Sequence, residues 1–346
     1  MKQFLLAIFL LAAILFSACS ATSPVTLTVM THDSFAASES VITAFEQANH
    51  VKVVFLKSGD AGAALNKAIL SKDAPLADVF YGVDNTFLSR ALDAGIYVPY
   101  ASPLLAKIPA EFQLDPQDRA LPVDYGDICI NYDKSYFAAL SLPVPASLED
   151  LLKPEYRSLL VVENPATSSP GLAFLLATVS HFGPERYLGF WRSLRHNGLV
   201  VVDGWETAYY TNFSASSGHG PQPLVISYNS SPAAEVVYAA TPLTDAPTAS
   251  ILGPDTCFRQ VEFVGILKGT GHLNLAQEFV DFMLGQKFQE GIPLQMFMYP
   301  VNTDASLPEE FTRYAHVAVQ PATLDPAVIA ANRDQWIADW TDVVLR

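Results

Sequence analysis

Strand-like and helix-like segments alternate along almost the whole chain, and few folds accommodate that order. Residues 26–30 alternate polar and apolar side chains, as a half-buried strand does. Residues 38–48 place Val41, Ile42 and Phe45 at helical spacing. The pattern continues with a strand at 51–56, a helix at 61–70, a strand at 77–81 and a helix at 85–94. This order predicts a parallel sheet with helices on both faces.

A second alternating set follows a strand predicted near residues 120–132. Its strands are predicted at 158–162, 199–202, 224–228 and 261–267, and its helices at 170–181, 185–195, 205–213, 232–239, 273–288 and 325–345. A chain of 346 residues that is 50% hydrophobic can bury two cores. We therefore expect an α/β protein with two lobes, each built on a doubly wound sheet.

Residues 1–18 carry the features of an export signal. Lys2 precedes an apolar run at 4–16, which is shorter than the roughly 20 apolar residues of a membrane-spanning helix. The small residues before Cys19 resemble a bacterial lipoprotein cleavage site, and ordinary secretory cleavage nearby is the alternative. We predict a signal peptide at 1–18, lipidation of Cys19, and a lipid anchor and linker at 19–25.

The charge of the chain excludes some partners. It has 35 acidic residues against 20 Lys and Arg, a formal charge of −15. Nucleic-acid binding needs a basic surface, so we expect no nucleic-acid partner, whereas a cation would be attracted. The sequence has no phosphate-binding G-x-x-x-x-G-K-[ST] loop, no G-x-S-x-G elbow and no paired His at metal-ligand spacing. We predict no enzyme activity, no cofactor and no metal site.

Two cysteines remain beyond Cys19. Cys129 and Cys257 both lie in strand-like runs. A disulfide is possible outside the cell, and two buried free thiols are the alternative. The sequence leaves both open.

Aromatic and acidic residues gather just after the predicted strands, where open α/β sheets bind ligands. They are Trp205, Tyr209, Tyr228, Phe297, Tyr299, Asp33, Asp84 and Asp124. An aromatic face attracts a cation by about 0.5–2 kcal/mol, and a carboxylate complements its charge. A flat cationic heteroaromatic ligand would use both. Ser168 and Ser169, before a predicted helix, could hold a hydroxyl or phosphate group.

An ordered set of short motifs runs through nearly the whole chain beyond the predicted leader. They are THDSFAA at 31–37, ADV at 77–79, VDN at 83–85, DYG at 124–126, YDK at 132–134, TSSPGL at 167–172, GW at 204–205, AY at 208–209, SY at 227–228, SSPA at 230–233, MYPV at 298–301, PAV at 326–328 and WI at 336–337. In this order they resemble the thiamine-binding periplasmic proteins of bacterial ABC importers.

The resemblance implies a type II periplasmic-binding-protein fold with a hinge between its lobes. We place lobe 1 at 26–123 plus 262–306, and lobe 2 at 124–261 plus 307–346. It also implies a monomeric receptor that captures thiamine or a thiamine phosphate in the inter-lobe cleft and delivers it to an ABC permease and its ATPase. The expected location is the periplasm or the outer face of the cytoplasmic membrane, with the lipid anchor as the one membrane attachment.

By position, the resemblance implies ligand contacts from Asp33, Ser34, Asp84, Asn85, Asp124, Tyr125, Ser168, Ser169, Trp205, Tyr209, Tyr228, Ser230, Phe297 and Tyr299. Trp205 and Tyr228 would flank the ring system of the ligand. Asp33 and Asp84 would face its amino-pyrimidine or thiazolium ring, and the adjacent serines would lie near its hydroxyethyl or phosphate end. The family commonly has Trp where this chain has Phe297.

Each position also has a plainer structural interpretation. Asp84 could cap the helix predicted at 85, Asp33 could stabilise a turn, and the serines at 168 and 169 could cap the next helix. Trp205 and Phe297 could be core residues.

Two other functions fit parts of the sequence. Adjacent tyrosines also occur in ferric-ion-binding relatives, so Tyr209 and Tyr210, with His32 and Asp84, leave a ferric or other small-cation receptor as the alternative. A thiamine-degrading transferase on the same scaffold would need a nucleophile, for which Cys129 is the candidate.

Overall fold

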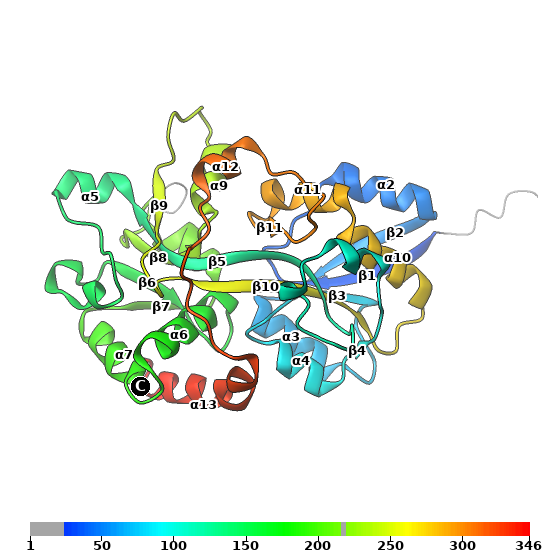
Figure 1. The fold of residues 1–346 in the computed structure, drawn as a ribbon, viewed down its shortest axis with the longest axis horizontal. Coiled ribbons are helices and arrows are strands. Elements are labelled where there is room, and N and C mark those ends of the chain that lie inside the picture. Colours follow the sequence, from blue (N-terminus) through cyan, green and yellow to red (C-terminus); the bar gives the residue numbers. More distant parts are fainter. Residues whose placement is uncertain (1–23, 216–218) are drawn as a thin grey trace, which may run out of the picture.

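The computed structural model describes residues 24–215 and 219–346, which form a two-lobed α/β molecule (Figure 1). The predicted signal peptide and the lipidation site at Cys19 lie outside the described residues.

Lobe 1 begins with the predicted alternation of strands and helices. Its elements are β1 (Val25–Thr31), α2 (Glu39–Asn49), β2 (Val51–Lys57), α3 (Ala61–Leu70), β3 (Val79–Asp84), α4 (Leu88–Ala94) and β4 (Tyr97–Val98), joined later in the chain by α10 (Leu273–Leu284) and α11 (Gln286–Gln295). The strands β1, β2 and β3 are parallel, which confirms the prediction for this half. The single helix predicted at 273–288 is instead two helices, because Gly285 has extended backbone between them.

Lobe 2 repeats the arrangement. Its elements are α5 (Lys134–Leu140), β6 (Leu160–Glu163), α6 (Ser169–Phe182), α7 (Tyr187–His196), β7 (Val200–Val202), α8 (Trp205–Thr207), β8 (Leu224–Tyr228), α9 (Ser231–Val237) and β9 (Thr248–Ile251), and a short π-helix follows α8 at Ala208–Asn212. The strands β6, β7 and β8 are parallel, as predicted. The remaining elements are β11 (Tyr299–Pro300), α12 (Glu309–Tyr314) and α13 (Pro326–Val344).

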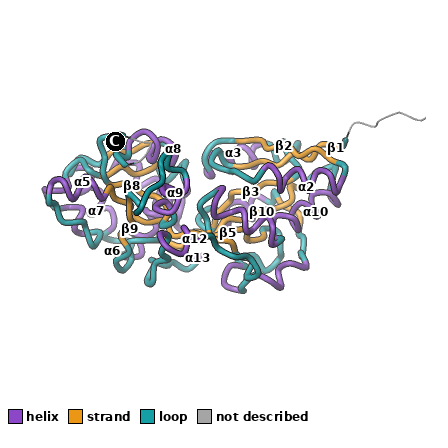
Figure 2. Tube along the Cα trace, turned by 90° about the horizontal axis from the view of Figure 1, so that it is seen from above, coloured by secondary structure: helices purple, strands orange, loops and turns teal. Residues whose placement is uncertain are grey.

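Two long strands join the lobes. β5 (Leu121–Asp133) and β10 (Phe258–Leu267) run between the two halves, side by side and antiparallel (Figure 1). They connect both halves into one sheet with the order β2-β1-β3-β10-β5-β8-β6-β7. The expectation of parallel sheets is therefore wrong at the centre, because β10 returns against both β3 and β5. Figure 2 shows the halves meeting around β5.

A disulfide joins the two crossing strands at their lobe 2 end. It links Cys129 of β5 to Cys257, the residue before β10, with 4.2 Å between their Cα atoms. Both cysteines are buried. The open question from the sequence is thus answered, and Cys129 is no free thiol nucleophile.

The last helix contacts both lobes. Trp340 of α13 packs edge-to-face on Trp191 of α7, with ring centroids 5.5 Å apart. Further toward its start, Arg333 donates to the backbone oxygen of Thr86 and to Ser89 at 3.3 and 3.2 Å. These contacts place α13 across the base of both halves (Figure 1). Among the described residues, no helix combines the length and apolar character needed to cross a membrane.

Candidate binding site between the lobes

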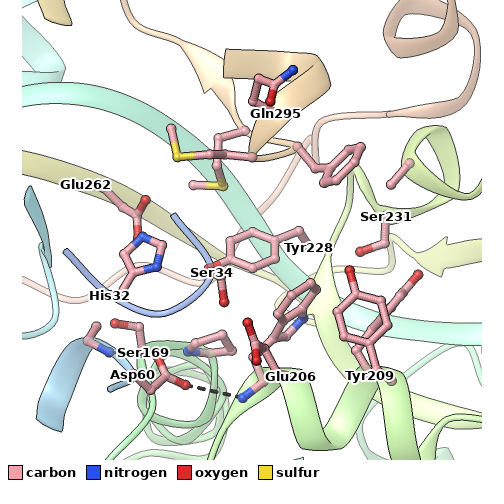
Figure 3. Close-up of a pocket in the computed structure, with 18 residues that line it drawn as sticks. His32, Ser34, Asp60, Ser169, Glu206, Tyr209, Tyr228, Ser231, Glu262 and Gln295 are labelled. Carbon is pink, nitrogen blue, oxygen red and sulfur yellow. Dashed lines mark hydrogen bonds and ion pairs between the residues drawn. The ribbon is translucent and has the colours of Figure 1, made fainter. Parts of the chain in front are cut away.

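A pocket lies where elements of the two lobes face each other (Figure 3). Lobe 1 and its connections supply His32, Ser34, Asp60, Ala61, Glu262, Gln295, Met296, Phe297 and Met298. Lobe 2 supplies Ser169, Pro170, Trp205, Glu206, Tyr209, Tyr210, Tyr228, Ser231 and Ala234. Most of these residues lie at or just after the ends of β1, β2, β7 and β8, or begin α6 and α9, whereas Glu262 lies inside β10 and residues 295–298 lie at and after the end of α11.

The lobe 2 side of the pocket is aromatic. Trp205 stacks on Tyr209 at 5.2 Å between ring centroids, with Tyr210 edge-on to the indole at 5.4 Å. The indole Nε1 donates to Ser227 Oγ at 2.8 Å, which holds the ring in place. Tyr209 donates its hydroxyl to Glu235 at 2.5 Å. This wall is therefore fixed by contacts within its own lobe.

Trp205 and Tyr228 share the pocket but do not flank a common slot. Their ring centroids are 6.1 Å apart and their planes are inclined by 74°, an edge-to-face contact. The two rings are in direct contact here, so this structure does not show the expected flanking arrangement, which stays a prediction. The two rings present adjoining, steeply inclined faces, and a flat ligand can stack on either of them.

The lobe 1 side of the pocket carries ionisable groups. His32 Nε2 lies 3.7 Å from Glu262 Oε1. Burial, the largest single effect, lowers the pKa of His32, but the carboxylate of Glu262 together with those of Asp60 and Asp33 outweighs it, and the pKa of His32 is raised. The ring fits close to β3 because position 82 is Gly, with a φ of +107°; a Cβ there would lie 2.4 Å from the imidazole.

Behind His32, three acids occupy adjacent strands. Asp84 of β3, Glu262 of β10 and Asp124 of β5 are register partners across the sheet. The Tyr81 hydroxyl lies 2.6 Å from both Glu262 and Asp124. Burial, and then the nearby Glu262 charge, raise the pKa of Asp124 well above its usual range. His32, followed by hydrogen bonding, keeps the pKa of Glu262 low despite burial. Within the cluster, Asp124 therefore holds a proton more readily than Glu262 does.

Asp60 links the lobes at the floor of the pocket. Its carboxylate accepts from the backbone N–H of Ala61 at 2.7 Å, at the start of α3. It also accepts from the backbone N–H of Trp205 in lobe 2 at 3.2 Å (Figure 3). Burial raises the pKa of Asp60, although these hydrogen bonds, His32 and the nearby Ser168 hydroxyl oppose the shift.

Six of the residues predicted from the sequence line this pocket: Ser34, Ser169, Trp205, Tyr209, Tyr228 and Phe297. The predicted acids do not. Asp33 accepts from the backbone of Gly59, and Asp84 caps the turn before α4 through Thr86 and Phe87, as in the plainer interpretation. Asp124 lies behind Glu262.

The other five predicted residues contact protein groups instead of lining the pocket. Asn85 bonds to the backbone of β10, and Tyr125 and Tyr299 stack on each other at 5.2 Å. Ser230 donates to the Phe297 carbonyl oxygen. Ser168 is fully buried beside Asp60.

Sequence reasoning missed the acids that do line the pocket. Asp60 lies three residues after the end of β2, so a search of that strand end would have found it. Glu206 follows Trp205 at the start of α8. Glu262 lies inside β10, and a search restricted to strand ends passes over it because β10 crosses between the lobes and brings its buried middle to the wall of the pocket.

Comparison with known proteins defines the class of this chain. The family model for bacterial extracellular solute-binding proteins matches residues 74–321, and the chain belongs to that family. Its two lobes around a central pocket are the architecture of such binding proteins.

The particular relatives are more specific. The thiamine-binding periplasmic protein of Brucella suis is 30% identical over 349 residues, covering 98% of each chain. A solved structure of a periplasmic thiamin binding protein matches with a TM-score of 0.83 at 28% identity, covering 94% of this chain and 98% of that one. Iron-bound HitA from Pseudomonas aeruginosa, at 20% identity and a TM-score of 0.75 over 92% of this chain and 99% of that one, shares the fold.

Proposed function

We propose that this chain is an extracytoplasmic receptor that captures thiamine between its lobes for an ABC importer. The observation that carries the proposal is one pocket with a wall of four aromatic rings facing Asp60 and Glu262. A thiazolium cation would stack on the rings of Trp205 and Tyr228, and the carboxylates would complement its charge. The names of the full-length relatives support the same ligand.

The remaining parts of the proposal follow from this role. We place lobe 1 at 26–123 plus 262–306 and lobe 2 at 124–261 plus 307–346, with the crossing strands β5 and β10 as the hinge. The receptor works as a monomer that docks on a permease driven by an ATPase. Lipidation of Cys19 would keep it at the outer face of the cytoplasmic membrane.

Binding without catalysis is part of the proposal, since the candidate nucleophile Cys129 is held in a disulfide. A ferric site is less well supported. Iron would require phenolates, whereas burial, together with Glu235, raises the pKa of the Tyr209 hydroxyl well above its usual range. The hydrogen bond from Tyr209 to Glu235 also turns that hydroxyl away from a metal.

Calorimetry on the purified mature protein tests the function. Thiamine should bind with measurable heat, and thiamine at about 100 times its Kd should stabilise the protein by about 2.7 kcal/mol in thermal unfolding. No heat and no shift with thiamine, thiamine monophosphate or thiamine diphosphate would refute the proposal. A coloured complex with ferric ion would favour the iron alternative.

A further inference from the structure

Tyr238 joins the two lobes beside the pocket. It is the residue directly after α9 in lobe 2, and its side chain is 62% exposed. Its hydroxyl donates to the backbone oxygen of Leu294 in α11 at 2.5 Å. The helices α9 and α11 come from opposite halves of the molecule (Figure 1). This hydrogen bond therefore exists only while the lobes are together.

The acceptor of this bond is a carbonyl at the end of a helix. The last four carbonyl oxygens of an α-helix have no partner within it. α11 ends at Gln295, so the carbonyl of Leu294 is one of these four. The hydroxyl of Tyr238 satisfies it. A side chain of lobe 2 thus completes the end of a helix of lobe 1.

Phe297, three residues beyond Leu294, has a backbone conformation that needs support. Its φ is +59°, in the left-handed region that bulky side chains rarely adopt. Such a residue persists only where its surroundings hold it. Its ring meets the ring of Tyr238 edge-on, with centroids 5.3 Å apart and planes inclined by 77°. Its carbonyl oxygen accepts from Ser230, which precedes α9. Both supports come from lobe 2.

The supported segment forms one side of the pocket. Residues 295–298 all line it, and Gln295 is seen there in Figure 3. Tyr238 holds the helix end that leads into this segment, and Tyr238 and Ser230 hold the turn at Phe297. If the lobes part, these contacts break together and the segment loses its support from lobe 2.

We propose that Tyr238 is a positioning residue that joins the closed lobes and holds residues 295–298 against the bound ligand. The proposal rests on the proposed function, because it requires that the lobes close on thiamine. Tyr238 acts through Leu294 and Phe297. Its contacts form after the ligand has entered, so they slow dissociation and leave association nearly unchanged.

Stopped-flow measurement of thiamine binding to the mature protein, followed by tryptophan fluorescence, tests this role. Tyr238→Phe removes the hydroxyl and keeps the ring, so thiamine should dissociate about threefold faster than from the wild type. Tyr238→Ala removes both contacts and should speed dissociation by about tenfold or more. The association rate constant should change by less than about twofold in either variant.

Tyr314→Phe is the matched control. The hydroxyl of Tyr314 also donates to a backbone oxygen, that of Thr244 at 3.3 Å, but both residues belong to lobe 2. Its two rate constants should equal those of the wild type. Because Tyr238 is exposed, its variants should also unfold in urea at the wild-type midpoint when no ligand is present. A merely structural role would lower that midpoint and would not separate the two rate constants.

A second variant removes the other support of the turn. Ser230→Ala leaves the Phe297 carbonyl without its donor, and thiamine should again dissociate about threefold faster with little change in association.

The outcomes separate this inference from the proposed function. Wild-type dissociation in both Tyr238 variants, or an effect on association alone, would overturn the positioning role and leave the proposed function standing. If thiamine does not bind the wild-type protein, the proposed function itself fails.

Discussion

The two walls of the pocket are built in different ways. The lobe 2 wall consists of rings held by partners in the same lobe, such as Ser227 for Trp205 and Glu235 for Tyr209. The lobe 1 wall consists of charges that depend on three neighbouring strands and, at Asp60, on a contact with the other lobe. Lobe 2 thus supplies an aromatic surface that is held by its own residues. Lobe 1 supplies carboxylates, and the arrangement of one of them, Asp60, also depends on a contact with lobe 2.

The aromatic wall should carry the largest share of affinity. Trp205→Ala removes the ring that stacks on Tyr209 and contacts Tyr228, and we expect thiamine binding to weaken by about a hundredfold in calorimetry. Trp205→Phe, the matched control, keeps an aromatic face and should lose no more than about tenfold. A loss below threefold in the alanine variant would show that this wall does not contact the ligand.

We expect the buried acids on the lobe 1 side of the pocket to lower the free energy of unfolding, unlike the aromatic rings of lobe 2. Burial raises the pKa of Asp84 to about 6, against 3.8 for the ordinary group. The folded protein therefore binds the proton more tightly than the unfolded chain, and this group's contribution to stability falls as the pH rises from about 4 to about 6.

The variant Asp84→Asn keeps an acceptor for the Thr86 N–H but cannot ionise. We expect it to be about 1–3 kcal/mol more stable than the wild type at pH 8 in urea unfolding, with the gain vanishing toward pH 4. Asp73→Asn, on the exposed surface, should show no such pH dependence. A gain that grows at low pH would contradict the buried charge.

We expect thiamine binding to release a proton from the lobe 1 side of the pocket, where His32 lies. His32 faces Glu262, with Asp60 and Asp33 nearby, and these acids raise the pKa of His32 despite its burial, which favours the protonated imidazole. A thiazolium cation in the same pocket opposes that charge, so binding should release a proton and strengthen by about three- to tenfold as the pH rises through the pKa of His32. Calorimetry in buffers of different ionisation enthalpy measures the release. In His32→Gln the pH dependence should flatten; if it persists, another group titrates.

We expect the smallest effect on thiamine affinity from a substitution that limits how closely the lobes approach each other. A Cβ on Gly62 of lobe 1 would lie 3.1 Å from the carbonyl oxygens of Ala166 and Thr167 in lobe 2. Gly62→Ala should weaken thiamine binding by about threefold, because the lobes then meet less closely. Gly189→Ala in α7 has open space around its new Cβ and serves as the control. Equal affinities in both variants would mean that the lobes need not approach this closely.

Local patterns predicted most of the elements and only part of the site. α3 and β8 have the predicted bounds, since apolar periodicity sets them within one segment. The direction of β10 escaped prediction, because pairing with β3 and β5 depends on residues far apart in the chain. The same limit applies to the site: Trp205 and Tyr228 were found as strand-end aromatics, whereas Glu262 reaches the pocket only through the crossing of β10.

The disulfide has a mechanical consequence. It joins β5 to the start of β10 at Cys129, near the lobe 2 end of these two strands. The regular pairing of β10 is interrupted further along, between Glu262 and Phe263 against β5 and between Phe263 and Val264 against β3. Flexure of the molecule would therefore concentrate at residues 262–264 rather than at the clamped end. Glu262 lies at this bend, so the direction of its carboxylate would change whenever the lobes open.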